Sequence, residues 1–243
     1  MRISRDSVAS VKAVLLVGGL ATRLREYVPD RPKCLVEIRG RPLIDHLLGI
    51  LRRQGFERVV LCIGVMGDMV RDHVGDGRRF GLEVEYAQED RPLGTAGAVY
   101  NARALLAEPF LLLNGDCLSG IDFTRLVGVF YERGAEGVDA LIRMPDVSEY
   151  GNVEIDEEGR LLAFREKQPE RRPGLINAGA YVFEPAALWE YAAGEPPVSL
   201  ERDVMPRMIS EGRALYGVPF EAPFIDVGTP QRLAEAQRAE WLD

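Results

Sequence analysis

Short apolar runs alternate with segments of helical periodicity over roughly the first 140 residues of the chain. Because strands buried on both faces of a parallel sheet are continuously apolar, these runs predict internal strands. Apolar residues spaced by three and four positions predict helices between them. Strands that alternate with helices indicate right-handed crossovers and a sheet covered on both faces. The expected strands are 12–17, 58–63, 82–86, 110–113 and 139–143, and the expected helices are 42–54, 66–74, 95–106 and 122–133.

The pattern changes after about residue 145, where strand-like segments follow one another closely. The first two of these segments are joined by Glu157-Glu158-Gly159, which predicts a hairpin and an antiparallel appendage rather than further crossovers. No internal repeat or long linker divides the chain, so we expect a single domain over residues 1–243. The later strands are expected at 152–156, 160–166 and 177–183, and the later helices at 185–191, 200–210 and 230–241.

Composition and charge narrow the class of protein. With 47% hydrophobic and 28% charged residues, the 243-residue chain has the usage of an ordinary globular protein. A net charge of −8 without a basic segment argues against a nucleic-acid partner. No apolar run reaches the length of a membrane span, so no membrane association is expected. Three cysteines without a CxxC pair and two histidines do not make a zinc site, and a cytoplasmic location is predicted.

Residues that directly follow the predicted strands deserve attention, because ligands of open parallel sheets bind beyond the carboxyl ends of the strands. Gly18 and Gly19 follow the first strand, and their backbone N–H groups could approach an anion closely. Arg23 and Lys33 lie nearby and could bind phosphate, although a tight turn with solvated cations fits the same residues. The segment is neither a Walker A motif nor GxGxxG.

Two aspartates follow apolar segments far apart in the chain. Asp116 stands in Asn-Gly-Asp after the strand 110–113, and Asp226 follows Pro223-Phe224-Ile225. Either aspartate alone is common in turns. Together, two carboxylates beside a phosphate site suit Mg²⁺, which takes few protein oxygens and several phosphate oxygens. The segment Leu93–Gly97 opens a predicted helix with small residues, which would let a flat ring or another backbone come close.

Several segments in one order make the chain resemble a known family. LLVGGLATRLREYVPDRPKCLVEI (15–38) is similar to the signature GGxGTRLxxxT…PK of sugar-1-phosphate nucleotidyltransferases. The likeness spans nearly the whole chain and is greatest to the guanylyltransferases for mannose 1-phosphate and D-glycero-D-manno-heptose 1-phosphate. It continues at LGTAGAV (93–99), NGDCL (114–118), YGNVEID (150–156), REKQP (165–169), NAGAYVF (177–183) and FIDVGTP (224–230).

The resemblance implies a Rossmann-like three-layer α/β/α fold with a mostly parallel central sheet and a small antiparallel sugar-binding extension. The implied nucleotide-binding part covers about 11–145, the sugar-binding part about 146–225, and a metal-site strand and helix about 222–243. The implied reaction joins an NTP, with GTP favoured, to a sugar 1-phosphate and releases pyrophosphate. The implied catalytic residues are Arg23, Lys33 and Asp116, and Mg²⁺ would be held by Asp116 and Asp226. The nucleotide would contact Val17, Gly18, Gly19, Leu20, Ala21, Thr22, Gln88, Gly94 and Thr95, and the sugar phosphate Gly151, Glu166, Lys167 and Asn177.

Departures from the family pattern leave alternatives open. Ala21 replaces the third glycine of the signature, and Gln168 separates Lys167 from Pro169. The nucleobase is not fixed by the residues, so a glucose-1-phosphate nucleotidyltransferase that uses dTTP or UTP is an alternative. A catalytically silent regulatory protein that binds a sugar nucleotide is another, although Arg23, Lys33 and both aspartates are present. The sequence leaves open whether the chain forms a homo-oligomer.

Overall fold

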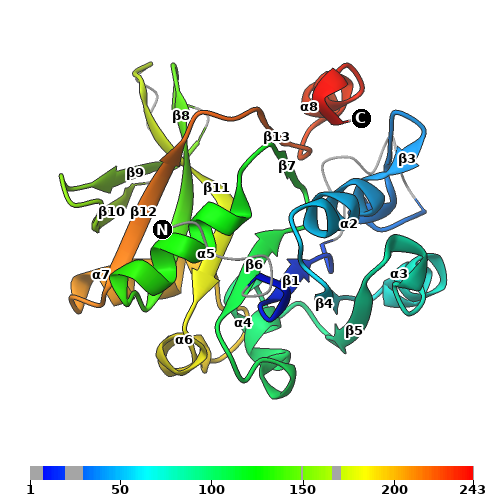
Figure 1. Ribbon diagram of the computed structural model, residues 1–243, viewed down its shortest axis with the longest axis horizontal. Coiled ribbons are helices and arrows are strands. Elements are labelled where there is room, and N and C mark those ends of the chain that lie inside the picture. Colours follow the sequence, from blue (N-terminus) through cyan, green and yellow to red (C-terminus); the bar gives the residue numbers. More distant parts are fainter. Residues whose placement is uncertain (1–7, 20–29, 149, 166–170, 243) are drawn as a thin grey trace.

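The computed structural model describes residues 8–19, 30–148, 150–165 and 171–242. Within them, nine strands form one sheet that extends from a hairpin at the left of Figure 1 to β5 at the right. The strands of this sheet are β1 (Lys12–Leu16), β4 (Arg58–Ile63), β5 (Glu83–Gln88), β6 (Phe110–Asn114), β8 (Gly137–Met144), β9 (Asn152–Ile155), β10 (Leu161–Arg165), β11 (Gly174–Phe183) and β12 (Leu215–Phe220).

Two small two-stranded ladders and a set of helices complete the fold. The ladders are β2 (Glu37–Ile38) with β3 (Arg41–Pro42), and β7 (Cys117–Ser119) with β13 (Phe224–Asp226). None of the helices that the structure describes is long and apolar enough to cross a membrane. The α-helices are α2 (Leu43–Arg53), α3 (Gly67–Val74), α4 (Thr95–Asn101), α5 (Phe123–Arg133), α6 (Pro185–Ala192), α7 (Met205–Ser210) and α8 (Pro230–Ala236).

Two hydrophobic cores lie on opposite faces of the sheet. On β1, Ala13 and Leu15 belong to one core and Val14 to the other, as the twofold alternation of a strand requires. Helices α2, α3 and α5 contribute to the first core, and α4, α6 and α7 to the second. The strands predicted in the first half and the three-layer α/β arrangement are confirmed.

The four adjacent strands β6-β1-β4-β5 are parallel to one another, and β1 lies between β6 and β4. The chain runs from β1 to β4 and β5 on one side and only later to β6 on the other side. This change of direction opens a crevice beyond the carboxyl ends of β1 and β6, where ligands of such sheets bind. The fold therefore directs attention to the residues after Leu16 and Asn114.

The second half differs from the expectation in several places. The antiparallel strands join the main sheet, because β11 pairs with β6, β8 and β9. Strand β12, which pairs in parallel with β8, is not predicted by the sequence pattern. The predicted helix 200–210 begins with a π turn at Leu200–Val204 before α7. The predicted helices 95–106 and 230–241 are shorter, since α4 ends at Asn101 and α8 at Ala236.

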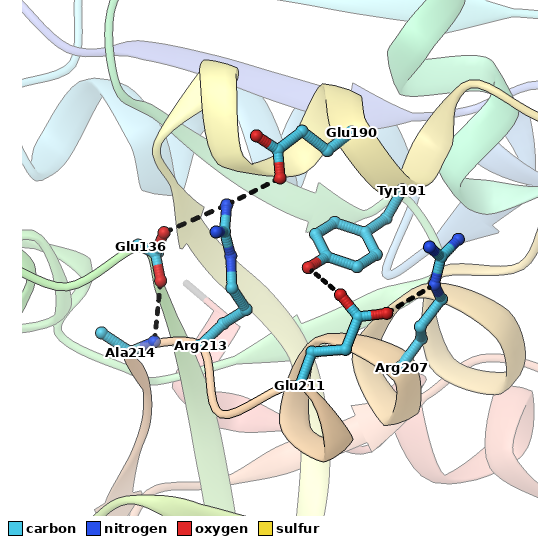
Figure 2. A network of polar contacts seen from close by, with 7 residues as sticks. All are labelled: Glu136, Glu190, Tyr191, Arg207, Glu211, Arg213 and Ala214. Carbon is cyan, nitrogen blue, oxygen red and sulfur yellow. Dashed lines mark hydrogen bonds and ion pairs between the residues drawn. The ribbon is translucent and has the colours of Figure 1, made fainter.

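A polar network fixes the start of β12 to its neighbours (Figure 2). Arg213 binds Glu136, next to β8, at 3.2 Å and Glu190 of α6 at 2.9 Å. The other carboxylate oxygen of Glu136 accepts the backbone N–H of Ala214 at 2.8 Å. The Glu136 carboxylate thus binds both the side chain of Arg213 and the backbone N–H of Ala214, which precede β12. These contacts fix the position of the first residue of β12 beside β8, away from the crevice beyond β1 and β6.

Candidate functional site

Two cavities lie beyond the carboxyl ends of the strands and share Asn114 and Asp116 in their walls. The larger cavity has a volume of about 430 Å³, within the range of small-molecule sites, and the smaller about 270 Å³. The larger is lined by Leu16, Val17, Gly18, Gly19, Lys33, Cys34, Cys62, Val65, Glu89, Pro92, Gly94, Thr95, Ala98, Asn114, Gly115 and Asp116. The smaller is lined by Asn114, Asp116, Cys117, Tyr150, Gly151, Phe164, Asn177, Gly179, Glu201, Phe224 and Asp226.

The turn after β1 forms one wall of the larger cavity. Val17, Gly18 and Gly19, all predicted to bind the nucleotide, lie there. Gly18 is closely packed, since a Cβ at this position would lie 3.0 Å from the backbone N of Gly64 and from Oε1 of Glu89. The glycine thus permits the close approach of two neighbouring loops. The predicted residues Leu20, Ala21, Thr22 and Arg23 lie outside the described residues.

The loop after β5 and the start of α4 form another wall. Gly94 and Thr95, for which the resemblance implies nucleotide contact, line the larger cavity. Gln88 does not: its side chain is exposed, and Oε1 accepts a long 3.4 Å hydrogen bond from Arg71. The adjacent Glu89, which no motif singled out, faces the larger cavity instead. Its backbone N–H binds Ile63 and its Oε2 accepts the N–H of Leu93 at 3.2 Å.

The backbone at Gly94 has a conformation that glycine alone adopts readily. Its φ of 80° and ψ of 170° lie in a region essentially closed to other residues. A Cβ on Gly94 would also lie 2.4 Å from the carbonyl oxygen of Val198. The short distance between the two backbones also permits a hydrogen bond, in which the N–H of Ala96 donates to the carbonyl oxygen of Val198 at 3.0 Å.

We therefore predict that Gly94→Ala lowers the free energy of unfolding by about 3 kcal/mol or more, because strain and a backbone clash add. Gly212→Ala is the matched control: Gly212 also has a positive φ, of 74°, but open space around its Cβ position. It should cost about 1 kcal/mol, from strain alone. Chemical denaturation of both variants makes the comparison. Equal losses would contradict the close contact with Val198.

Lys33 and Asp116 form an ion pair where the two cavities meet. Pro32 precedes a 3-10 turn at Lys33–Leu35, which aims the ammonium group inward. Its Nζ lies 2.6 Å from Oδ2 of Asp116, and the lysine side chain is 14% exposed. The sequence alone could not distinguish Lys33 from an ordinary surface lysine. In the structure its side chain is largely buried and lies beside Asp116, the predicted metal ligand.

The ladder of β7 and β13 brings Asp226 to Asp116. In its antiparallel register Asp226 lies opposite Cys117, and the N–H of Val227 donates to the carbonyl of Asp116 at 2.8 Å. Ligand atoms of Asp116, Cys117 and Asp226 lie within 4.8 Å of one another, so the two carboxylates can reach one cation. Burial, followed by the charges of both aspartates, raises the pKa of the Cys117 thiol well above its usual range. This keeps the thiol in its protonated form at neutral pH.

The smaller cavity contains Gly151 and Asn177, as predicted for sugar-phosphate contacts. The Asn177 side chain is already engaged: Oδ1 accepts the N–H of Gly179 at 2.7 Å, and Nδ2 donates to the hydroxyl of Tyr181. At the junction of the cavities, Oδ1 of Asn114 is buried with no hydrogen-bond partner among the described residues. The predicted residues Glu166 and Lys167 lie outside the part of the chain that the structure describes.

Glu201 is a residue of the smaller cavity that the sequence pattern missed. Its carboxylate accepts three hydroxyl hydrogen bonds, from Thr95 at 3.0 Å, Tyr181 at 3.1 Å and Ser199 at 3.2 Å. The Thr95 hydroxyl also accepts the N–H of Leu200 at 2.7 Å. Glu201 gives no sequence signal, because it stands among other charged residues in the segment Leu200–Val204. Two of its donors, Thr95 and Tyr181, lie far away in the sequence and meet it only in the folded chain.

A model of the nucleotidyl transferase family matches residues 12–241. The chain belongs to this family. It is 37% identical to the mannose-1-phosphate guanylyltransferase of Mycobacterium tuberculosis, over 91% of this chain and 62% of that protein. Identity to the mannose-1-phosphate guanylyltransferase catalytic subunit beta of Drosophila melanogaster is 34%, over 90% of this chain and 60% of that protein. This nucleotidyl transferase thus spans about three fifths of the length of these curated relatives.

Solved structures agree with the family assignment. HddC from Yersinia pseudotuberculosis, in complex with GMP-PN, superposes with a TM-score of 0.82 at 28% identity. The match covers 93% of this chain and 98% of that one. A putative glucose-1-phosphate thymidylyltransferase from Bacillus anthracis, at 20% identity, shares the fold with a TM-score of 0.83 over 94% of both chains. The nucleotidyltransferase fold expected from the sequence is confirmed.

Proposed function

We propose that this nucleotidyl transferase joins the nucleotidyl group of GTP to a sugar 1-phosphate and releases pyrophosphate. The observation that carries the proposal is the meeting of two cavities at Asp116, with Lys33 and Asp226 beside it. A nucleotide in the larger cavity and a sugar phosphate in the smaller would place both phosphates at this junction. The names of the guanylyltransferase relatives favour GTP with mannose 1-phosphate. D-glycero-D-manno-heptose 1-phosphate is the other sugar phosphate that the sequence resemblance implies.

The arrangement suits this chemistry because the attacking phosphate oxygen is already an anion at neutral pH, so no general base is needed. The barrier is the approach of two anions, and fixed cations and positioning lower it. We assign Lys33 and Arg23 to charge neutralisation. The turn at Val17–Gly19 with Leu20, Ala21 and Thr22, together with Gly94 and Thr95, is assigned to nucleotide binding. Gly151, Glu166, Lys167 and Asn177 are assigned to the sugar phosphate.

The carboxylates fit a divalent cation. Two acids that can reach one ion, and that leave space for phosphate oxygens, match the preference of Mg²⁺ for a few protein oxygens. We therefore propose Asp116 and Asp226 as the residues that hold Mg²⁺, which when bound would neutralise phosphate charge. The Lys33 ammonium also lies against Asp116, with which it forms an ion pair at 2.6 Å.

That ion pair makes Lys33 a competitor of the cation before the nucleotide arrives. We predict that Lys33→Ala binds Mn²⁺ at least about tenfold more tightly than the wild type in the absence of nucleotide, because one positive charge close to the ion is removed. The same variant should lose turnover. Titration with Mn²⁺, with the free ion measured by electron paramagnetic resonance, tests this. Unchanged or weaker Mn²⁺ binding would separate Lys33 from the metal site.

We also infer that the functional parts share one domain, with nucleotide binding in about 11–145, sugar binding in about 146–225 and the metal-site strand and helix in about 222–243. The support is β11 of the second part, which pairs with β6 and β8 of the first part and with β9 of its own part. A division between two domains would have to break this strand from the sheet.

The direct test is pyrophosphate release by the purified chain with Mg²⁺. GTP, UTP, dTTP, CTP and ATP are each combined with mannose 1-phosphate, D-glycero-D-manno-heptose 1-phosphate and glucose 1-phosphate. We expect release with GTP and one of the first two sugars. Release only with dTTP or UTP and glucose 1-phosphate would replace the proposed substrates. Nucleotide binding without release from any pair would favour the silent regulatory protein.

A further inference from the structure

The smaller cavity has a wall rich in negative charge. Its described lining contains three carboxylates, Asp116, Glu201 and Asp226, and no cationic side chain. Lys33 forms its ion pair with Asp116 from the side of the larger cavity. A sugar 1-phosphate would bring further negative charge into the smaller cavity, and like charges repel one another most strongly where water is excluded. A further cation close to this wall would therefore favour binding of an anionic sugar.

Arg232 brings a guanidinium group to this wall. Its Cζ atom lies 4.4 Å from the centroid of the Tyr150 ring, within the range of cation–π attraction. Tyr150 lines the smaller cavity, whereas Arg232 does not. Arg232 is half-buried in the first turn of α8, where its backbone N–H donates to Oγ1 of Thr229 at 3.3 Å. Arg232 can therefore affect a ligand in the cavity through the ring of Tyr150.

The position of the Tyr150 ring depends on its neighbours, because this residue lies in the connection between β8 and β9. Its backbone N–H donates to the carbonyl of Val147 at 2.9 Å, and its ring packs at the border of the first hydrophobic core. A guanidinium group is flat and stacks on an aromatic face, so Arg232 limits the orientations that the ring can take. The chain reaches this place through β13, which ends at Asp226 in the wall of the same cavity.

We propose that Arg232 is a positioning residue for the sugar phosphate: it holds the Tyr150 ring in the wall of the smaller cavity and brings positive charge to that wall. This inference rests on the proposed function, in which the smaller cavity holds the sugar 1-phosphate. No described residue of α8 lines the larger cavity. The effect of Arg232 is therefore confined to the sugar phosphate and spares the nucleotide.

Three replacements separate the charge of Arg232 from the ring on which it acts. Arg232→Gln removes the positive charge, and Arg232→Lys keeps it. Tyr150→Leu removes the aromatic ring. The matched control is Arg238→Gln, which removes an exposed cation just beyond α8 that lines neither of the two cavities. Chemical denaturation of every variant shows whether it is folded under the conditions of the assay.

The experiment measures kcat and both KM values by pyrophosphate release, with the substrate pair that the wild type uses. Arg232→Gln should raise KM for the sugar 1-phosphate about three- to tenfold, while kcat and KM for the nucleotide stay within about twofold. Arg232→Lys and Arg238→Gln should stay close to the wild type, because the ring also attracts an ammonium group. In a Tyr150→Leu background, Arg232→Gln should change KM for the sugar 1-phosphate by no more than about twofold, because the contact is already lost.

Three results would overturn the inference while leaving nucleotidyl transfer intact. One is an unchanged KM for the sugar 1-phosphate in Arg232→Gln. Another is an equal rise of both KM values, which would mean that Arg232 has a general structural role. The third is the full effect of Arg232→Gln in the Tyr150→Leu background, which would mean that Arg232 does not act through the ring. If the wild type releases no pyrophosphate from any substrate pair, the proposed function fails together with this inference, so the two failures are distinguishable.

Discussion

Asp116→Asn should lower the rate of nucleotidyl transfer by about a hundred- to a thousandfold, while the free energy of unfolding changes by no more than about 1 kcal/mol. Asp116 lies where both cavities meet, bound to Lys33 and within reach of the same cation as Asp226. Asparagine keeps the shape and one oxygen but removes the charge that a cation requires. The Asp116 side chain is 37% exposed, so the ion pair that it forms with Lys33 adds little to stability.

Pyrophosphate release and chemical denaturation of the same preparations measure the two quantities. Glu221→Gln, an exposed acid that lines neither of the two cavities, is the control for a general change in charge. Activity of Asp116→Asn near that of the control would remove Asp116 from the metal site. A large loss of stability would instead make Asp116 a structural residue.

Asp139→Asn should stabilise the protein, and by more at pH 8 than at pH 5. Asp139 is fully buried in β8, and neither carboxylate oxygen has a hydrogen-bond partner among the described residues. Burial, followed by the charge of Glu201, raises the pKa of this carboxyl well above its usual range. The folded protein therefore keeps a proton that the unfolded chain releases above about pH 4.

The sign follows from proton counting. Because the folded state binds the extra proton, the contribution of Asp139 to stability is full below the unfolded pKa and is lost as pH rises towards the folded pKa. Within that window the loss is about 1.4 kcal/mol for each pH unit. Asparagine cannot titrate, so the free energy of unfolding of Asp139→Asn should exceed that of the wild type by this additional amount for each pH unit.

Denaturation curves between pH 5 and pH 8 test this prediction. The matched control is Asp72→Asn, since Asp72 lies exposed on α3. A difference between wild type and Asp139→Asn that stays constant with pH would show that Asp139 ionises in the folded protein despite its burial.

Local periodicity was sufficient to predict the strands in the first half of the fold. Continuous apolar runs place β1, β4 and β6, because both faces of these strands are buried against helices. Strand β12 was missed because it contains Gly217 and Pro219, which normally interrupt a strand. Both are tolerated because β8 is the one described strand that forms a ladder with β12, and the other side of β12 makes only an isolated bridge between Tyr216 and Arg160. The position of a strand can be predicted from the local sequence, whereas the strand with which it pairs depends on contacts between distant residues.

Most of the predicted site residues that the structure describes line one of the two cavities, and the mismatches between prediction and structure have a geometric cause. Gln88 and Glu89 are consecutive, and successive side chains at the end of a strand point to opposite sides. A shift of the strand end by one residue would therefore decide whether Gln88 or Glu89 points into the cavity, and the sequence pattern does not determine the strand end that accurately. Glu201 depends on donors from Thr95, Ser199 and Tyr181, which only the folded chain assembles.

The Thr95–Glu201 hydrogen bond has a consequence for the order of events in a catalytic cycle. It connects the first residue of α4, in the wall of the larger cavity, to an acid in the wall of the smaller one. Any ligand that moves the start of α4 also moves the Glu201 carboxylate. By thermodynamic linkage, the factor by which one substrate changes the affinity of the other is the same in both directions. The two halves of the site can therefore sense each other's occupancy through a single hydroxyl group.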